Sequence, residues 1–364
     1  MAILEKNLLA HGSDNSENSG NEILAVCFVG ECLLLVAVGS SIACYSLEVE
    51  DVVIAKHLSS IDLESGVVNS MQVFQSEASD SVYSVICACD DALACVLVSI
   101  HGDGSIKLER GLHSTTLHSA FVCCAKVSSF ASSASSKGIS APCIISGGFD
   151  SKVKVSDLYG KALHEFDLNQ QSPSHSGNVK QLFNPPYVHS LDIHSGGSWV
   201  VVASGNGSLE LLNLEYKVRS EPTDAHPSSV NFVTFASIPS PSSTNQTIVI
   251  SAGNDSTLAF RTFEVPKIEK DITTAADIRG RQAELHAKIA ASNGKSSKPQ
   301  LKLLNSFTSQ LAQLKGTPTM QLVKQMKFEQ KINWVTATSR MTTSGNVFVA
   351  DTSDSVTCFR VLMQ

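Results

Sequence analysis

One short segment, residues 250–263, indicates how the chain folds. It reads ISAGNDSTLAFRTF: an apolar run, a turn containing Gly, Asn and Asp, and a second run with alternating character. Gly, Asn and Asp tolerate the positive φ angles that tight hairpin turns need. Alternation with a period of two residues is typical of a strand. The segment therefore predicts an antiparallel β-hairpin.

The same pattern occurs five more times, which makes a repeat the main feature of the chain. The copies are VAVGSSIACYSL (36–47), VSIHGDGSIKLE (98–109), ISGGFDSKVKVSD (145–157), VASGNGSLELLNL (202–214) and VADTSDSVTCFRV (349–361). Another β-rich run precedes each hairpin, at Ile23–Val29, Val82–Ala88, Phe121–Val127, Val188–Ile193, Val230–Phe235 and Ile332–Thr338. The repeating unit is therefore three strands followed by a more variable fourth.

The spacing of these units indicates the fold class. Successive first strands begin 59, 39, 67, 42 and 102 residues apart. The short values match the ~40–45 residues of a four-stranded propeller blade. We therefore predict an all-β propeller with six detectable blades. Seven blades are the alternative, because residues 48–81 hold two further β-rich runs, Val52–Leu58 and Val67–Phe74.

Two units share three polar residues at matching positions. These residues are His118, Ser146 and Asp150 in one unit, and His226, Ser251 and Asp255 in the other. Such side chains can form a buried hydrogen-bonded network that ties a loop to a strand. The same residue types make up hydrolase triads, but their recurrence at repeat spacing favours a structural role. We predict no catalytic residue here.

With these features the chain resembles WD40 repeats in a degraded form. Asp157 stands where that family has the Asp of its Trp-Asp pair, and Ser156 holds the Trp position. The resemblance extends over residues 22–364 and is strongest in 184–263 and 328–362. Members of the family have seven blades. The resemblance implies that Ile3–Leu9 forms an outer strand that closes the ring on the last blade.

Composition narrows the function further. Charged residues are 17% of the chain, against ~25% in ordinary globular proteins, and 43% of residues are hydrophobic. No run of ~18 apolar residues is present, and the first residues lack the pattern of a secretory signal. Most of the ten cysteines fall in apolar runs, so we expect reduced core thiols in a cytoplasmic or nuclear protein.

Residues 264–331 differ from the rest of the chain. They carry net charge +6 against −13 for the remainder, and we predict a Lys-rich, partly helical or disordered insertion between blades at 1–263 and 332–364. Ala-rich residues 274–292 predict one helix. A second helix would present one apolar stripe, made of Leu304, Phe307, Leu311 and Leu314. The segment is a linker, a docking helix for a partner, or a contact for an acidic protein or RNA.

We expect a non-catalytic protein–protein interaction scaffold. Loops before first strands and between second and third strands gather on one face of a propeller. This predicts a partner-binding face with His101, Phe149, Asn206 and Asn254. An enzyme is the alternative, and it would need charged residues in the central channel, where we expect Val, Cys and Ala.

A ligase role is a further alternative that the family resemblance raises. Some WD40 proteins are substrate receptors of cullin-4 ubiquitin ligases and bind the adaptor through Asp/Glu-x-Arg after a third strand. The candidate positions, 48–50 and 157–159, lack the Arg, so we predict weak or absent adaptor binding. Motifs for phosphate loops, metal ligation and hydrolase nucleophiles are absent from the sequence, which predicts no cofactor and no metal.

Overall fold

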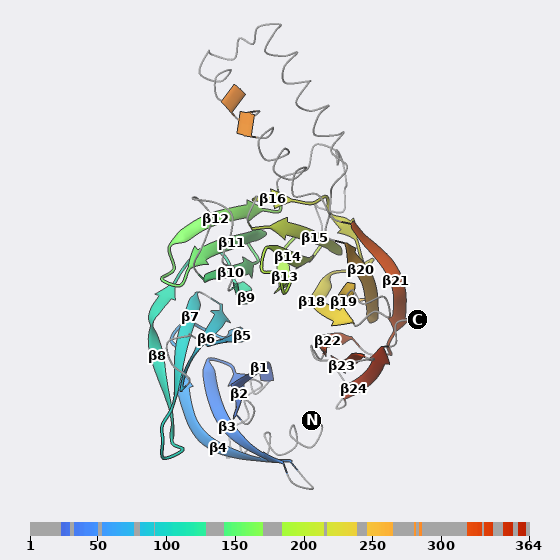
Figure 1. The fold of residues 1–364 in the computed structure, drawn as a ribbon. Coiled ribbons are helices and arrows are strands. Elements are labelled where there is room, and N and C mark those ends of the chain that lie inside the picture. Colours follow the sequence, from blue (N-terminus) through green and yellow to red (C-terminus); the bar gives the residue numbers. More distant parts are fainter. Residues whose placement is uncertain are drawn as a thin grey trace, which may run out of the picture.

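The structure is a computed structural model, and its fold is drawn in Figure 1. It describes residues 23–29, 33–49, 53–75, 81–90, 92–128, 142–169, 184–214, 217–238, 246–264, 280–281, 284–285, 319–329, 331–337, 345–351 and 356–361. Within this part of the chain, no helix is long and apolar enough to cross a membrane.

Six antiparallel sheets follow one another along the chain, and within each the strands pair in chain order. We number these sheets as blades 1 to 6. Blade 1 holds β1 (Ile23–Val29), β2 (Leu33–Val38), β3 (Ser41–Val49) and β4 (Val53–Asp62). Blade 2 holds β5 (Val68–Gln75), β6 (Val82–Cys89), β7 (Leu93–Ile100) and β8 (Ile106–Thr115). Blade 3 holds β9 (Val122–Ser128), β10 (Cys143–Gly148), β11 (Lys152–Asp157) and β12 (Ala162–Asp167).

The second half of the chain continues the series. Blade 4 holds β13 (Val188–Ile193), β14 (Trp199–Ser204), β15 (Ser208–Asn213) and two short strands that both pair with β15, β16 (Val218–Arg219) and β17 (Thr223–Asp224). Blade 5 holds β18 (Val230–Ile238), β19 (Gln246–Gly253), β20 (Thr257–Glu264) and β21 (Thr319–Lys327). Blade 6 holds β22 (Ile332–Ala337), β23 (Gly345–Asp351) and β24 (Val356–Val361).

The blades stand around a common centre, with the first strand of each innermost (Figure 1). Neighbouring inner strands pack on one another in sequence: β1 on β5, β5 on β9, β9 on β13, β13 on β18, and β18 on β22. Apolar clusters fill the space between adjacent blades, because a radial sheet must bury both of its faces. All six residues of β14 are buried for this reason. Each buried Val or Leu contributes about 1.5–3 kcal/mol.

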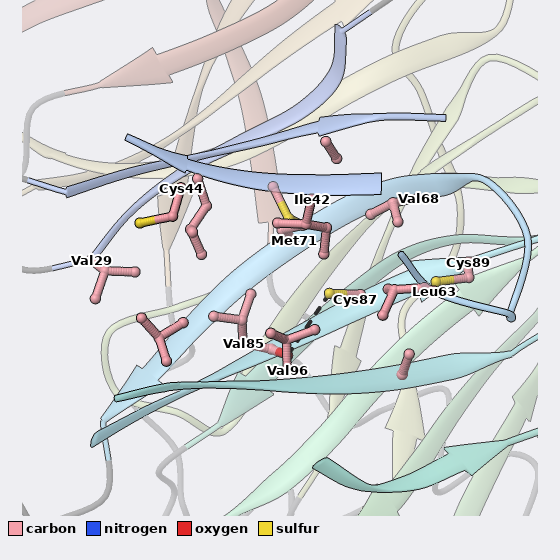
Figure 2. Packing of buried hydrophobic residues seen from close by; sticks show 14 residues of the cluster. Val29, Ile42, Cys44, Leu63, Val68, Met71, Val85, Cys87, Cys89 and Val96 are labelled. Carbon is pink, nitrogen blue, oxygen red and sulfur yellow. Dashed lines mark hydrogen bonds between the residues drawn. The ribbon is translucent and has the colours of Figure 1, made fainter. Parts of the chain in front are cut away.

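The cluster between blades 1 and 2 shows how the cysteines are used (Figure 2). Cys44, Cys87 and Cys89 are buried there beside Ile42 and Val85. Burial raises the pKa of the Cys44 thiol to about 11 and that of Cys89 to about 12. These thiols therefore pack as small apolar groups. The eight described cysteines form no disulfide with one another.

Each innermost strand carries a β-bulge at its second residue. In blade 2, for example, Val68 pairs with Cys89 and Ser70 with Ala88, so Asn69 has no residue opposite it. The six bulged residues are Leu24, Asn69, Cys123, His189, Asn231 and Asn333. A bulge turns the local backbone and redirects a side chain. Its presence at one position in all six blades marks the blades as copies of a single unit.

Two boundaries differ from the prediction. The innermost strand of blade 2 is β5 and not Val82–Ala88, so the hairpin at 98–109 joins the third and fourth strands. The sequence predicts a β-rich run at Val67–Phe74 but not its innermost position, because Asn69, Ser70 and Gln72 find their hydrogen-bond partners only in blade 3. The run Val52–Leu58 likewise falls mainly in β4, the outer strand of blade 1.

The second boundary concerns the insertion. Strand β21 lies inside the predicted 264–331 segment and pairs with β20 from Thr257–Lys327 to Glu264–Thr319. The excursion from the sheet is therefore 265–318. Residues 280–281 and 284–285 are helical, within the first predicted helix. The stripe of Leu304, Phe307, Leu311 and Leu314 and the predicted strand Ile3–Leu9 lie outside the described residues.

Candidate functional site

The ends of the inner strands define one face of the ring. Because successive strands of a blade reverse direction, the start of the first strand lies beside the turn between the second and third. Backbone hydrogen bonds join the two in blades 3, 4 and 5, from Phe149 N to Phe121 O, Gly205 N to Tyr187 O, and Asn254 N to Ser229 O. We call this the upper face.

The structure places three of the four predicted face residues on the upper face. Phe149, Asn206 and Asn254 lie in its turns. His101 is exposed but lies in the β7–β8 turn, at the opposite, lower face. The one-strand shift in blade 2 explains this difference. Asn206 Oδ1 accepts hydrogen bonds from the backbone N–H and the hydroxyl of Ser208. The Asn254 side chain accepts from Asn231 and donates to Ser229. Both amides therefore stabilise the turns in which they lie.

The three polar residues of blade 3 come together. His118 Nδ1 donates to Asp150 Oδ1 at 2.9 Å, because a carboxylate only accepts, and Ser146 Oγ donates to His118 Nε2 at 2.8 Å. A Cβ on Gly148 would lie 2.8 Å from the His118 ring, so only glycine leaves room for the imidazole. The network ties the loop before β9 to β10 and to the turn that follows it.

Blade 5 repeats the arrangement with one addition. His226 Nε2 bonds to Ser251 Oγ at 2.9 Å, and its Nδ1 lies 3.1 Å from Asp255 Oδ1 and 2.8 Å from Thr257 Oγ1. Arg261, six residues after Asp255, donates to Ser251 Oγ at 2.9 Å and to Ala225 O at 2.8 Å. In blade 3 the matching position is Ser156, a buried residue whose hydroxyl has no partner among the described residues.

These networks have the connectivity of a hydrolase triad but not its accessibility. Ser146 and Ser251 have no exposed surface, and His118 and His226 are 8% and 7% exposed. Burial lowers the pKa of both imidazoles. A nucleophile must be able to contact its substrate. The Ser146 and Ser251 hydroxyls are fully buried, so a substrate at the surface cannot reach them. They hold loops in place.

An aromatic cluster spans blades 3 and 4 on the upper face. Phe149 is at its centre, stacked on Tyr187 with ring centroids 5.1 Å apart and edge-on to His189 at 5.5 Å and Phe121 at 6.1 Å. Phe149 is half-buried by this packing, whereas Phe121 is 52% and Tyr187 36% exposed. We call these four residues the aromatic patch.

Two bulged side chains of the upper face are used to join blades. Asn69 Nδ2 donates to Val122 O in blade 3 at 3.0 Å, and Asn231 Nδ2 donates to Ile332 O in blade 6 at 3.4 Å. The bulged residues between them, Cys123 and His189, make no hydrogen bond within the described part of the chain. The aromatic patch therefore lies where the side chains of the bulged residues, Cys123 and His189, make no hydrogen bond to a neighbouring blade among the described residues.

Polar side chains of the inner strands seal the edges that face the centre. Ser70 and Gln72 accept from backbone N–H groups of β9 at 3.4 and 2.6 Å, and Ser190 and Asp192 do the same for β18 at 3.2 and 2.8 Å. An inner strand is a sheet edge with unpaired donors. The inner strands therefore carry Ser, Gln and Asp side chains in addition to the Val, Cys and Ala that we expected to line the channel.

The charged groups of this lining neutralise each other. Lys126 Nζ lies 3.8 Å from Asp192 Oδ1, and Asp192 Oδ2 also accepts from Thr234 Oγ1 at 2.8 Å. These contacts join blades 3, 4 and 5. No group of three or more possible metal ligands occurs among the described residues.

Comparison with known proteins identifies the fold. No family profile matches the chain, and no curated protein sequence does. Among solved structures, the chain is similar to BBS1N in its complex with ARL6DN, with a TM-score of 0.53 and 11% identity over 94% of this chain and 78% of that one. The chain folds as a β-propeller. At this identity the likeness shows the architecture alone.

Sequence reasoning singled out Phe149 but missed Phe121 and Tyr187, which are the exposed rings. A signal was available. Both stand two residues before a bulged residue, where the other units have Val67, Ser229 and Lys331. An alignment of the units on their bulges would have shown aromatic residues at this position in blades 3 and 4 only.

Proposed function

We propose that the protein is a non-catalytic interaction scaffold that binds a partner protein through the aromatic patch. The observation that carries the proposal is the exposure of Phe121 and Tyr187 at one place on the rim. Exposed aromatic rings in a contiguous patch are typical of interaction sites. A rigid frame on which loops carry the contacts is also the usual arrangement for binding. The solved complex of BBS1N with ARL6DN shows that a propeller of similar fold binds a protein.

We also propose that the ring is a divergent WD40-type propeller related to WD repeat-containing protein 53. Two His-Ser-Asp networks at equivalent positions support this. The segments NPPYVHS (184–190) and KINW (331–334), each at the opening of a blade, also resemble that protein. The reduced, unpaired thiols fit a cytoplasmic or nuclear location.

A ligase-receptor role has weaker support. The turn at 157–161 is closed by Asp157 Oδ1, which accepts from the backbone N–H of Tyr159 and of Lys161 at 2.9 and 2.8 Å. This Asp is therefore engaged in its own turn, and the position two residues later is Tyr and not Arg. We propose that the adaptor binds weakly or not at all.

The basic insertion is a second candidate for recruiting a partner. Residues 265–318 carry nine Lys and Arg against four Asp and Glu, a net charge of +5, and the remaining residues carry −12. Glu264 and Thr319 are paired across β20 and β21, so the insertion can be replaced by a short turn without removing a strand. An acidic protein or RNA bound there would dissociate as salt rises.

One affinity purification with mass spectrometry tests both sites. We compare the full chain, the double variant Phe121→Ala/Tyr187→Ala, the variant Tyr159→Ala, and a chain with 265–318 replaced by a short turn. Tyr159 is the matched control, since it is 74% exposed on a lower-face turn of the same blade. We expect the main partner to be lost only from the double variant. Retention there and loss from the shortened chain would assign recruitment to the insertion.

A further inference from the structure

We infer that the aromatic patch recognises a Lys or Arg side chain of an extended peptide, with its stem lying on Phe121 and its charge facing Asp90 and Asp150. This inference rests on the proposed function and specifies the chemistry of the partner. It combines the exposed ring of Phe121 with two carboxylates that approach the same stretch of backbone from opposite sides.

Asp90 reaches this point from blade 2. The Asn69 amide nitrogen donates to Asp90 Oδ1 and to Val122 O, at 3.0 Å in each case. Two oxygens that share one donor at that distance are at most about 6 Å apart. The Asp90 carboxylate therefore lies close to the peptide between Val122 and Cys123. Its charge also acts on the Cys123 thiol.

Asp150 reaches the same place from within blade 3. Its Oδ2 accepts from Ser119 N at 3.2 Å, and the N–H of the preceding Phe149 donates to Phe121 O at 2.9 Å. The partner of Asp150, His118, is buried, and burial lowers the pKa of its imidazole. The positive charge of Lys154 also acts on the Asp150 carboxylate. Asp90 and Asp150 both act on the Cys123 thiol, two residues after Phe121.

The surroundings favour a cation over an anion or a neutral chain. A ring face attracts Lys and Arg, with about 0.5–1 kcal/mol at exposed sites and about 2 kcal/mol where water is excluded. Outside the insertion the chain carries net charge −12. Lys331 is exposed, and its positive charge acts on His189, on the blade 4 side of the patch. That placement would orient a peptide with its basic residue over blade 3.

The test uses arrays of random 12-residue peptides probed with the purified full chain. We compare wild type, Phe121→Ala, Asp90→Asn and Tyr159→Ala. Asp90→Asn keeps the oxygen that accepts from Asn69, and it removes the charge together with the long 3.4 Å hydrogen bond from Val67 N to the other oxygen. Peptides that bind in a Phe121-dependent manner are then resynthesised with norleucine in place of Lys, and with citrulline in place of Arg.

We expect the Phe121-dependent peptides to be rich in Lys and Arg. Replacing Lys by norleucine or Arg by citrulline should weaken the binding of these peptides by about 3- to 30-fold, and Asp90→Asn should do the same. Tyr159→Ala should change nothing, and raising salt from about 0.1 M to about 1 M, where the screening length falls from ~10 to ~3 Å, should weaken binding. Phe121-dependent peptides without basic residues would overturn the inference and leave the scaffold standing. The absence of Phe121-dependent peptides would overturn both.

Discussion

The His118 network offers a direct measure of what holds the upper-face loops in place. Replacing His118 with Leu keeps a side chain of similar size and removes both hydrogen bonds. One of these, at 2.9 Å, goes to a carboxylate and is worth about 1.5–3 kcal/mol, and the other, at 2.8 Å, goes to a hydroxyl and is worth about 0.5–1.5 kcal/mol. We expect the free energy of unfolding to fall by about 2–4 kcal/mol.

Part of this loss comes from the Ser146 hydroxyl, which is fully buried and would be left without a partner. The double variant His118→Leu/Ser146→Ala removes that hydroxyl and should recover about 1 kcal/mol. Urea denaturation followed by far-UV circular dichroism measures these differences. His101→Leu is the matched control, because His101 is exposed and the change there should stay within about 0.5 kcal/mol. A His118→Leu loss no larger than that of the control would refute the reasoning.

Three further outcomes are expected. Burial lowers the pKa of His118 and His226 below the ordinary 6.5, so below that pH the unfolded imidazoles bind protons that the folded ones do not. Stability measured by urea titration should therefore fall as pH drops through 6.5, and less steeply in His118→Leu. Cys87 is buried and its thiol pKa is raised, so it should resist thiol reagents at pH 8 in the native protein, and Cys87→Ser should cost about 1–3 kcal/mol in urea titration. Arg219 donates to Glu210, which is 1% exposed, so Arg219→Met should lower the unfolding free energy by about 3–5 kcal/mol, and Glu210→Gln in that background should restore part of it.

Arginine side chains supply hydrogen bonds that join neighbouring blades. Arg219 donates to the backbone carbonyls of Asp167 and Leu168 in blade 3, and Arg110 of blade 2 donates to Asp62 O of blade 1 at 2.8 Å. Within blade 5, Arg261 donates to Ser251 Oγ at 2.9 Å. Long, multiply donating side chains can bridge gaps that a large ring would fill.

Local sequence was sufficient for most of the repeat. Tight turns of Gly, Asn and Asp between alternating runs identified the hairpins of blades 1, 3, 4, 5 and 6, because turn geometry and strand periodicity are properties of neighbouring residues. The pattern of His118, Ser146 and Asp150 could also be recognised from the sequence, because a similar pattern recurs in blade 5. The innermost position of β5 and the strand β21 were not predicted, because their polar residues find partners, or lie at an edge, only once the blades are assembled.

The amino-acid order thus specified an all-β repeat, its hairpins and the residues that tie its loops. Which residues share a surface was decided only by the packing of neighbouring blades on one another. Phe121 and Tyr187 are 66 residues apart in the sequence, and they meet around Phe149 because adjacent blades place equivalent positions side by side. The same packing brings Asp90 of blade 2 to the backbone beside Phe121 through Asn69. Contacts of this kind depend on the register between blades, which no stretch of local sequence encodes.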